Sequence, residues 1–340
     1  MRLPDDWYRG RGWLWLWWPL SLLFCGLVRL RRRAYRRGWL KQVRLPVPLI
    51  IVGNITVGGT GKTPMVLWLA GYLRQQGYRP GLISRGYGGD LQGRVHVVHV
   101  DADPRIVGDE ALLLARRSGS PMVVGRDRVA AAQTLLEHYP VDVIIADDGM
   151  QHYRLGRTIE IAVLDGQRRL GNGWCLPAGP LREPAARLAE VDFVVSNGDA
   201  LEGEWPMRLE ATTVRRLDGR LEERVDTHLG EHDSLTLAQW RNQRVHAVAG
   251  IGHPQRFFDF LRMHGIEPVP HPFADHHPYQ AGELEFADDL PVLMTEKDAV
   301  KYMNHASARH WYLQVEARMP DAFGSALLAK LENSDGQKTA

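Results

Sequence analysis

The chain has 340 residues, of which 44% are hydrophobic and 24% are charged, and its formal net charge is +2. These values are ordinary for a globular protein and exclude a disordered chain, a collagen-like chain and a multi-span transporter. The length favours about two domains, and the two cysteines are too few for a disulfide framework, which fits a reducing compartment.

Charge is distributed unevenly along the chain. Residues 1–44 carry a net charge of +9, and the remaining residues carry −7. Within the basic segment, residues 13–28 hold no charge and are rich in tryptophan and leucine, and arginines follow them directly. Such a helix is short for a hydrocarbon core of ~30 Å, tryptophan prefers the headgroup level, and arginines are attracted to anionic lipid on the cytoplasmic side. We therefore expect residues 1–44 to form a membrane-associating segment whose helix lies in the interface; a single membrane span and a buried core helix are the alternatives.

From residue 45 onward, short apolar runs alternate with helical stretches, which predicts βαβ units on a parallel sheet. Residues 49–52 are expected to form a buried strand that leads into the glycine-rich sequence GNITVGGTGKT at residues 53–63, and an amphipathic helix follows, ending at Gly77. A strand, a glycine-rich turn and a helix N-terminus in this order indicate a P-loop, whose backbone N–H groups bind nucleotide phosphates. The loop departs from the usual pattern at Thr56, which replaces the first glycine.

The P-loop supplies the first candidate site residues. Lys62 is expected to reach the β- and γ-phosphate oxygens, and Thr63 to hold Mg²⁺ through its hydroxyl. The expected phosphate cradle comprises Gly58, Gly59, Thr60, Gly61, Lys62 and Thr63. A second nucleotide signal is the apolar run at residues 141–146, which ends in Asp147 and Asp148. Because P-loop proteins place a Mg²⁺-holding carboxylate at the end of a strand, both acids are predicted metal ligands, Asp147 before Asp148.

Together with further motifs, these residues resemble a known enzyme family. The motifs are, in chain order, VGNITVGGTGKTP (52–64), SRGYG (84–88), GDE (108–110), GRDR (125–128), DDGMQH (147–152), LPAGPLREP (176–184) and TEKD (295–298). In this order they resemble the tetraacyldisaccharide 4′-kinases, the lipid A 4′-kinases of Gram-negative bacteria, over residues from about 45 to 315. The basic apolar head is similar to that family's membrane-associating N-terminal helix.

The resemblance implies a fold, an activity and a location. The implied α/β fold is a P-loop NTPase-like parallel sheet with flanking helices, a second, smaller α/β subdomain and an N-terminal hydrophobic membrane-associating helix. The implied reaction transfers the γ-phosphoryl group of ATP to the 4′-hydroxyl of tetraacyldisaccharide 1-phosphate in lipid A biosynthesis, with Mg²⁺, at the cytoplasmic face of the bacterial inner membrane. The expected partners are the lipid A disaccharide precursor and a membrane surface with anionic lipid; no nucleic-acid partner is expected.

The resemblance also implies which residues accept the proton of the sugar hydroxyl, a poor nucleophile. Asp109 of the GDE motif is the implied general base, and its implied partner is His276 in the sequence HPFADHHPY at residues 271–279. A histidine that is hydrogen-bonded to a carboxylate is oriented by it and changes its basicity. The adjacent His277 is an alternative partner. From the residues alone, Asp109 and Glu110 could instead complement a helix dipole, and the histidines could be surface residues or zinc ligands.

Further candidates complete the expected site. By resemblance, Arg128 contacts phosphate, which suits a guanidinium group; the alternative is an exposed helix residue. Gln151 is implied near the nucleotide or Mg²⁺, and Glu110 is a further candidate metal ligand. The role of Arg85 in the SRGYG motif is open.

The expected elements suggest a domain organisation. A kinase core at residues 45–204 is expected to add strands at 80–84, 122–124, 141–146, 159–164 and 192–196. Residues 205–226 alternate around Asp218-Gly219, which predicts a hairpin linker. A C-terminal α/β subdomain at residues 227–332 is expected to contain strands at 245–249, 291–295 and 310–315 and a helix at 254–264, before a frayed tail at 333–340.

An alternative function is a membrane-bound P-loop ATPase switch of the deviant-Walker, dimerising type. Such proteins carry the pattern KGGxGKT, with a lysine that reaches across the dimer, but Val57 occupies that position here. A GTPase switch is also disfavoured because the guanine-reading sequence NKxD does not occur in the chain. The sequence therefore favours the kinase.

Overall fold

The computed structural model describes residues 6–8, 12–217 and 234–336. It divides the chain into two compact units. Unit one consists of Met1–Arg85, Ser120–Leu209 and Ala317–Ala340, and unit two consists of Gly86–Gly119 and Glu210–Glu316. Each unit is therefore built from segments that are distant in the sequence.

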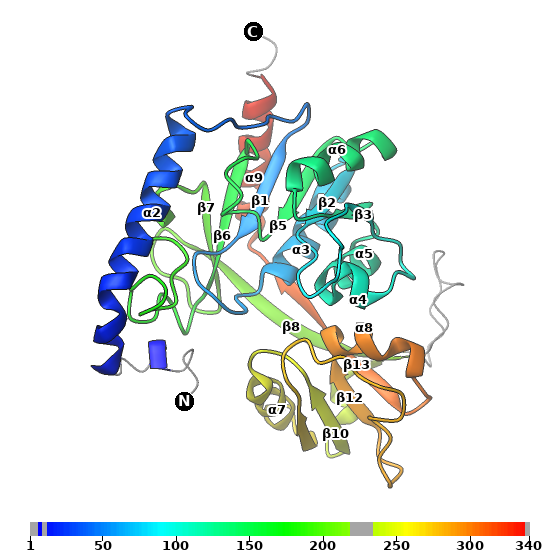
Figure 1. Cartoon of the computed structure of the whole chain (residues 1–340). Coiled ribbons are helices and arrows are strands. Elements are labelled where there is room, and N and C mark those ends of the chain that lie inside the picture. Colours follow the sequence, from blue (N-terminus) through cyan, green and yellow to red (C-terminus); the bar gives the residue numbers. More distant parts are fainter. Residues whose placement is uncertain (1–5, 9–11, 218–233, 337–340) are drawn as a thin grey trace. The chain divides into compact units, whose positions relative to one another are not determined.

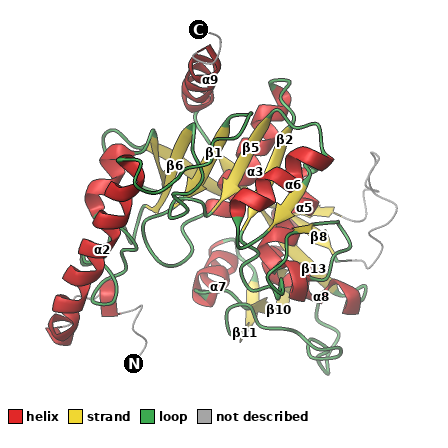
Figure 2. Cartoon of the chain, turned by 45° about the horizontal axis from the view of Figure 1, so that its top comes forward, coloured by secondary structure: helices red, strands yellow, loops and turns green. Residues whose placement is uncertain are grey.

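Unit one contains a buried parallel sheet (Figures 1 and 2). Its strands are β1 (Leu49–Gly53), β2 (Pro80–Ser84), β4 (Met122–Val124), β5 (Val143–Asp147), β6 (Ile159–Asp165) and β7 (Phe193–Asn197). They lie in the order β7-β6-β1-β5-β2-β4, and each neighbouring pair is parallel. β1, β2, β5 and β6 are buried along their whole length, which explains why they form continuous apolar runs in the sequence. The expected α/β fold with a parallel sheet is thus confirmed.

Helices cover this sheet. They include α3 (Lys62–Gln75), α6 (Arg128–His138) and α9 (Asp321–Gly336). α3 packs against β1, β2 and β5, and α6 packs against β2 and β4. The ring of Phe323 on α9 lies 5.5 Å from the ring of Trp68 on α3 and 5.4 Å from that of Phe193 on β7. Aromatic packing therefore joins the C-terminal helix to unit one.

The register of β1 and β5 fixes the place of the nucleotide signals. These strands are neighbours, and Val52 lies level with Asp147. The loop after β1 and the acids at the end of β5 therefore leave the same edge of the sheet. In parallel α/β sheets, ligands bind at the carboxyl ends of the strands.

Unit two contains a second parallel sheet with a core on each face. Its elements are β3 (His96–Val97), α4 (Pro104–Val107), α5 (Asp109–Ser118), β10 (Arg244–Ala249), α7 (Pro254–Met263), β11 (Glu267–Pro272), β12 (Val292–Thr295), α8 (Glu296–Tyr302) and β13 (His310–Arg318). The strand order is β11-β10-β12-β13. Along β10, Val245 and Ala247 pack with α7, whereas Val248 packs with α8, because side chains of a strand alternate between its faces.

The division into units differs from the sequence-based boundaries in two places. Residues 86–119 belong to unit two, because α5 packs against α8, and α9 belongs to unit one, because Phe323 packs there. The first residues of the expected tail at 333–340 belong to α9, which continues to Gly336.

The first residues of the expected hairpin linker at 205–226 form strand β8. β8 (Trp205–Arg216) pairs in parallel with β7 near its start and antiparallel with β9 (Ser234–Thr236) near its end. The turn expected at Asp218-Gly219 lies outside the described residues.

The N-terminal segment forms a largely exposed helix. A short 3₁₀ helix, η1 (Gly12–Trp17), runs into α2 (Trp18–Arg36). Among the described residues, Gly12–Arg36 is one helix that is long and apolar enough to cross a membrane, and 11% of its apolar window is buried. This exposure argues against a buried core helix and is compatible with both an interfacial helix and a span.

Candidate active site

The P-loop begins where β1 ends and finishes in the first turn of α3. Gly58 and Gly61 have φ angles of 102° and 99°, a backbone conformation that residues with a side chain rarely adopt. A Cβ atom at Gly61 would also lie 2.9 Å from the amide nitrogen of Asn197. Among the described residues, nothing lies within 4 Å of the corresponding position at Gly59. The loop is therefore tightly folded, and its backbone is open at Gly59, as a phosphate cradle requires.

Hydrogen bonds within the loop hold this shape. The side-chain nitrogen Nδ2 of Asn54 donates to the carbonyl oxygen of Gly58 and to Oγ1 of Thr60, both at 3.4 Å. The carbonyl oxygen of Asn54 accepts a hydrogen bond from Nε2 of Gln151 at 3.0 Å. Gln151, expected near the nucleotide, thus supports the P-loop from the turn that follows β5.

Two carboxylates follow at the end of β5. Asp147 is 3% exposed, and the hydroxyl of Ser84 donates to its Oδ2 at 3.5 Å. The carboxylate of Asp148 accepts hydrogen bonds from Nη1 of Arg182 at 3.0 and 3.2 Å and lies 3.6 Å from Nζ of Lys62. Burial would raise the pKa of Asp148, but the charges of Lys62 and Arg182 outweigh burial and lower it. Asp148 is therefore ionised at neutral pH.

These residues form a donor set that suits a hard cation. Thr63 is the second residue of α3 and offers a hydroxyl oxygen, and Asp147 and Asp148 offer carboxylate oxygens. Mg²⁺ prefers oxygen ligands of these kinds. The residues present therefore fit Mg²⁺ at the carboxyl edge of the sheet.

Arg128 contacts the turn that follows β5. It is the first residue of α6, whose N-cap Asp127 accepts hydrogen bonds from the N–H groups of Val129 and Ala130. The Arg128 side chain is buried, and its Nη1 donates to the carbonyl oxygen of Asp148 at 2.7 Å. The alternative of an exposed helix residue is therefore wrong, and Arg128 braces the turn that carries the second acid.

In unit two, Asp109 and His276 form a hydrogen-bonded pair. Asp109 is the first residue of α5, and Nδ1 of His276 lies 3.0 Å from its Oδ1 and 2.9 Å from its Oδ2. Burial would raise the pKa of Asp109, but the hydrogen bond with His276 and nearby positive charges outweigh it and lower the pKa. The same hydrogen bond raises the pKa of His276. The pair can hold a proton between a carboxylate and an imidazole.

The other histidines of the 271–279 sequence have different partners. Nε2 of His277 lies 2.8 Å from Glu283, and Nε2 of His271 lies 2.9 Å from Nδ1 of His246. Among the described residues, the structure contains no group of three His, Cys, Asp or Glu side chains that could hold a metal ion. The structure thus distinguishes His276 from His277 as the partner of Asp109.

Helix α8 begins within the TEKD motif and contacts residues close in sequence to Asp109 and to His276. Lys297 forms an ion pair with Glu110, the residue after Asp109. Tyr279, three residues after His276, donates a hydrogen bond from its hydroxyl to Oδ1 of Asp298 at 3.0 Å. The motif was visible in the sequence, but its contacts with Glu110 and Tyr279 were not, because they join distant segments.

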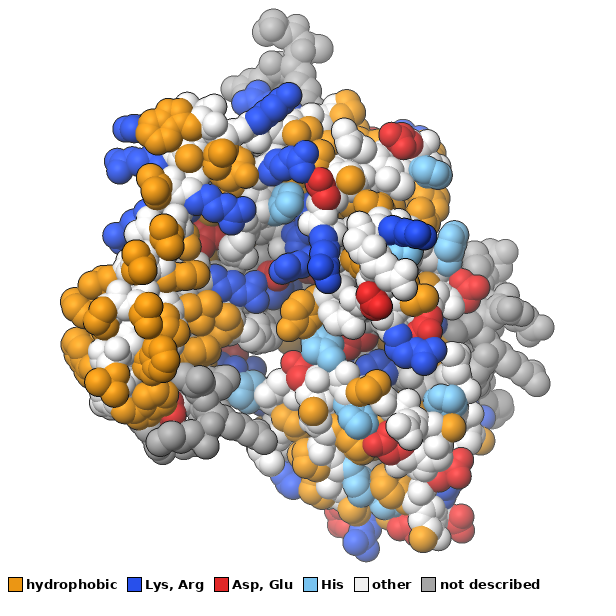
Figure 3. Space-filling model, in the orientation of Figure 1, with side chains coloured by type: hydrophobic (Ala, Val, Ile, Leu, Met, Phe, Trp, Pro, Cys, Tyr) orange, Lys and Arg blue, Asp and Glu red, His pale blue; other side chains and the backbone are white. Residues whose placement is uncertain are grey.

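The side chains of the N-terminal helix form an apolar surface. Figure 3 shows hydrophobic side chains gathered over α2, with basic side chains among them. The exposed members include Trp15, Leu16, Trp17, Trp18, Leu20, Leu22, Leu23, Leu27 and Leu30. A contiguous exposed apolar surface of this kind marks a membrane or protein interaction site.

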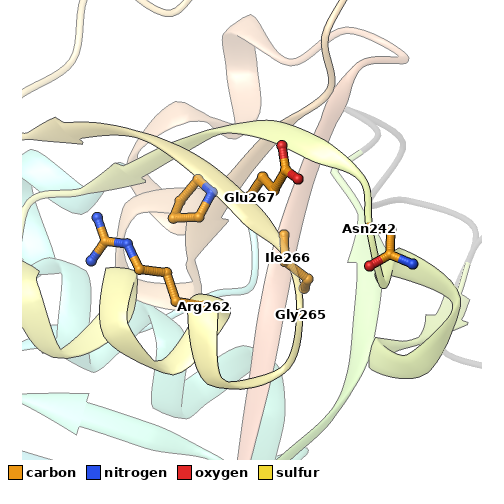
Figure 4. Close-up of a pocket in the computed structure, with 6 residues that line it drawn as sticks. Asn242, Arg262, Gly265, Ile266 and Glu267 are labelled. Atoms are coloured by element: carbon orange, nitrogen blue, oxygen red, sulfur yellow. The ribbon is translucent and has the colours of Figure 1, made fainter.

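A shallow pocket in unit two does not involve the candidate residues. It lies at the end of α7 and the start of β11, where Arg262 and Glu267 border it together with Asn242 (Figure 4). None of the described residues that line it belongs to the P-loop or to the Asp109–His276 pair.

The chain is similar to known proteins over nearly its whole length. The chain is similar to the tetraacyldisaccharide 4′-kinase of Nitrosococcus oceani, with 50% identity over 332 residues that cover 98% of this chain and 95% of the relative. It is 53% identical to the tetraacyldisaccharide 4′-kinase of Alkalilimnicola ehrlichii over 332 residues, which cover 97% of this chain and 95% of the relative.

The structure is similar to a crystal structure of LpxK from Aquifex aeolicus in complex with ATP. The TM-score is 0.77 at 26% sequence identity, and the match covers 94% of this chain and 99% of that one. A family model for tetraacyldisaccharide-1-P 4′-kinases matches residues 13–332. The match extends over nearly the whole chain, so the chain belongs to the tetraacyldisaccharide-1-P 4′-kinase family.

Proposed function

We propose that this kinase transfers the γ-phosphoryl group of ATP to the 4′-hydroxyl of tetraacyldisaccharide 1-phosphate, a step of lipid A biosynthesis. The names of its relatives support the acceptor, and the ATP-bound structure supports the donor. The observation that carries the proposal is the Asp109–His276 pair. A kinase needs a group that takes the proton of a sugar hydroxyl, whereas the alternative ATPase switch does not.

The nucleotide site neutralises phosphate charge. Backbone N–H groups of residues 58–63 bind the phosphates, and Lys62 contacts the β- and γ-phosphate oxygens, where negative charge develops in the transition state. Arg128 and Arg182 hold Asp148 through its carbonyl and its carboxylate. They thereby fix the acid beside Lys62, and neither arginine needs to reach the phosphate for this role.

Thr63, Asp147 and Asp148 would hold Mg²⁺. When bound, the ion supplies charge neutralisation at the phosphates. Glu110 is left out of this shell because it lies on α5, whereas the acids proposed for Mg²⁺ follow one another at the end of β5. Its role in the proposed mechanism is to support the helix that begins with Asp109.

The Asp109–His276 pair accepts the proton of the acceptor hydroxyl. As the hydroxyl oxygen bonds to the γ-phosphorus and the bond to the bridging oxygen of ADP breaks, the hydroxyl proton passes to Asp109. His276 orients the carboxylate by donating a hydrogen bond from Nδ1. The low pKa of Asp109 keeps it ionised and ready at neutral pH.

The exposed face of α2 brings the enzyme to its lipid. Apolar burial and the arginine run are two membrane signals, and a single signal usually holds a protein only marginally. Arginines favour the anionic cytoplasmic leaflet, so we place the kinase at the cytoplasmic face of the bacterial inner membrane. There the sugar hydroxyl of a bilayer-embedded acceptor lies within reach.

The test is a direct measurement of phosphoryl transfer. Purified full-length protein is incubated with ATP, Mg²⁺ and tetraacyldisaccharide 1-phosphate in mixed micelles, and the lipid is weighed by mass spectrometry. We expect one added phosphate per ADP formed. Release of ADP without a change in lipid mass would instead favour the ATPase switch.

A P-loop variant shows whether the measured phosphoryl transfer comes from this protein or from a contaminating kinase. Lys62→Ala should lower kcat by about 100-fold or more, the order expected when a group that stabilises transition-state charge is removed. Unchanged turnover in this variant would contradict the assignment of the P-loop.

A further inference from the structure

The loop between β6 and β7 contains a segment that contacts two distant parts of unit one. We call residues 172–187 the bridging segment; it includes the LPAGPLREP motif at 176–184. Figures 1 and 2 show this loop beside α2. Apart from Arg182, the proposed reaction gives these residues no role. Their hydrogen bonds extend to α2 on one side and to the P-loop on the other.

On the side of the N-terminal helix, Ser21 connects the two. Its hydroxyl donates to the carbonyl oxygen of Cys175 at 2.8 Å and accepts from the N–H of Ala178 at 2.9 Å. Ser21 is 3% exposed, so these bonds are shielded from water. Sγ of Cys25, one turn further along α2, lies 2.9 Å from Sγ of Cys175. This face of α2 is therefore bound to the protein, whereas the apolar face is exposed.

On the side of the nucleotide, the bridging segment is bonded to the P-loop backbone. The N–H of Val57 donates to the carbonyl oxygen of Pro180 at 2.9 Å, and the N–H of Arg182 donates to the carbonyl oxygen of Ile55 at 2.7 Å. The guanidinium of Arg182 also binds the carboxylate of Asp148. The first half of the P-loop is therefore held by this segment as well as by β1.

A buried carboxylate joins the two sides. Glu183 is fully buried, and its Oε1 accepts from Nε2 of Gln151 at 2.8 Å, while the same nitrogen donates to the carbonyl oxygen of Asn54. Its Oε2 accepts a hydrogen bond from the hydroxyl of Tyr153 and lies 3.7 Å from Nε of Arg32 on α2 and 3.5 Å from Nε of Arg187. Nη2 of Arg32 is itself hydrogen-bonded to Glu190. A buried charge is tolerated only with such partners. Loss of Arg32 would remove one of the positive charges beside the buried carboxylate that binds Gln151.

We infer that the bridging segment transmits the position of helix α2 to the P-loop, so that Ser21 and Arg32 are positioning residues for nucleotide binding. The inference rests on the proposed function and deepens it. Each contact along the path is hydrogen-bonded or buried, and close-packed interiors transmit displacement. A well-placed α2 holds the P-loop in its phosphate-binding shape, and a displaced α2 loosens it.

The test compares two arginines of α2 that differ in burial. Arg32 is buried, and Arg33 is exposed. Full-length Arg32→Gln and Arg33→Gln lose the same charge from the same helix. We measure KM for ATP and kcat with acceptor lipid in vesicles containing anionic lipid, ATP binding by calorimetry without acceptor, and vesicle binding by flotation.

We expect KM for ATP to rise about tenfold in Arg32→Gln, the order expected when a buried carboxylate loses a charged partner, and to stay at the parent value in Arg33→Gln. Vesicle binding should fall in Arg33→Gln, whose side chain is exposed, and change little in Arg32→Gln. Arg32→Lys should recover part of the change, because it restores a positive charge beside Glu183. Ser21→Ala should raise KM for ATP by a smaller factor without changing vesicle binding.

The thermodynamic linkage between ATP binding and vesicle binding provides a second, independent test. If α2 and the P-loop are coupled, ATP must tighten vesicle binding by the same factor by which vesicles tighten ATP binding. This reciprocal effect should occur in the parent and disappear in Arg32→Gln.

Equal KM values for ATP in Arg32→Gln and Arg33→Gln, with a parent that binds ATP normally, would overturn the inference and leave α2 as an anchor. If Arg32→Gln does not fold, as judged by circular dichroism, Ser21→Ala decides: an unchanged KM for ATP there overturns the inference. A parent that phosphorylates no lipid would contradict the proposed function instead, and the two failures are therefore distinguishable.

Discussion

The carboxylate of Asp109 lies at the N-terminus of α5 and within hydrogen-bond distance of His276. The helix dipole and the imidazole both favour the ionised form, which explains how a buried carboxylate keeps its charge. Asp148 meets the same need differently, through Lys62 and Arg182. Each acid thus has the charge that its proposed task requires.

The Asp109–His276 pair should make stability depend on pH. The lowered pKa of Asp109 contributes stability that is present above its unfolded value and lost as pH falls through the folded value. The raised pKa of His276 contributes stability that is present below its unfolded value and lost as pH rises through the folded value. The parent should therefore exceed Asp109→Asn in stability most between about pH 4 and 6.5.

Urea unfolding of both proteins at pH 5.5 and pH 8.5 measures this difference. A gap in unfolding free energy that is the same at both pH values would show that the pair is not coupled.

In activity assays, Asp109→Asn should lower kcat far more than it changes KM for ATP. His276→Ala should cost less, and the double variant should be less than additive, because the two residues act as one unit.

Helix α8 is short, but its first turn organises unit two. Nη1 of Arg117 on α5 donates to both carboxylate oxygens of Glu296 at 2.6 and 2.8 Å, and Lys297 pairs with Glu110. Asp298 is fully buried and accepts hydrogen bonds from the N–H of Gly250 and from the hydroxyl of Tyr279. The same turn therefore supports the helix of Asp109 and the loop of His276.

Tyr279→Phe should weaken the support of His276. The variant loses one buried hydrogen bond, worth about 1 kcal/mol of stability, and we expect kcat to fall several-fold with KM for ATP unchanged, because the P-loop belongs to the other unit. The same substitution at Tyr139, the C-cap of α6, is the matched control. A rise in KM for ATP with kcat preserved would contradict this role for α8.

In the whole molecule, the residues proposed for nucleotide binding, proton transfer and membrane contact lie in different parts of the chain. Unit one contains the P-loop, the acids of β5 and α2, and unit two contains the Asp109–His276 pair. The two faces of α2 serve different ends, since Ser21 and Arg32 are buried against the protein while Leu23 and Leu27 are 60% and 56% exposed. Membrane contact and nucleotide support can therefore be separated by mutation.

The double variant Leu23→Glu/Leu27→Glu should release the protein from vesicles. Burial of a leucine side chain contributes about 1.5–3 kcal/mol, and a carboxylate would also be repelled by anionic lipid. Flotation with anionic vesicles should show a fall in binding of at least about tenfold, while KM for ATP in detergent stays at the parent value. Normal flotation of this variant would show that the apolar face binds something other than the membrane.

Features that depend on neighbouring residues could be predicted from the amino-acid sequence. Continuous apolar runs gave the strands of the parallel sheet because strands buried on both faces have no polar side. The glycines, Lys62 and Thr63 identified the P-loop because its conformation is set within one turn, and the uneven charge identified the head. Family motifs pointed to Asp109 and His276, whose catalytic roles stay predictions.

Contacts between distant segments became known only from the three-dimensional structure. It paired Asp109 with His276 rather than His277 across 167 positions of the sequence, and it joined Glu110 to Lys297 across 187. It also assigned residues 86–119 to unit two and α9 to unit one. Periodicity and capping act over a few residues, whereas the partner of a buried charge is set by which elements pack together, and packing is a property of the whole fold.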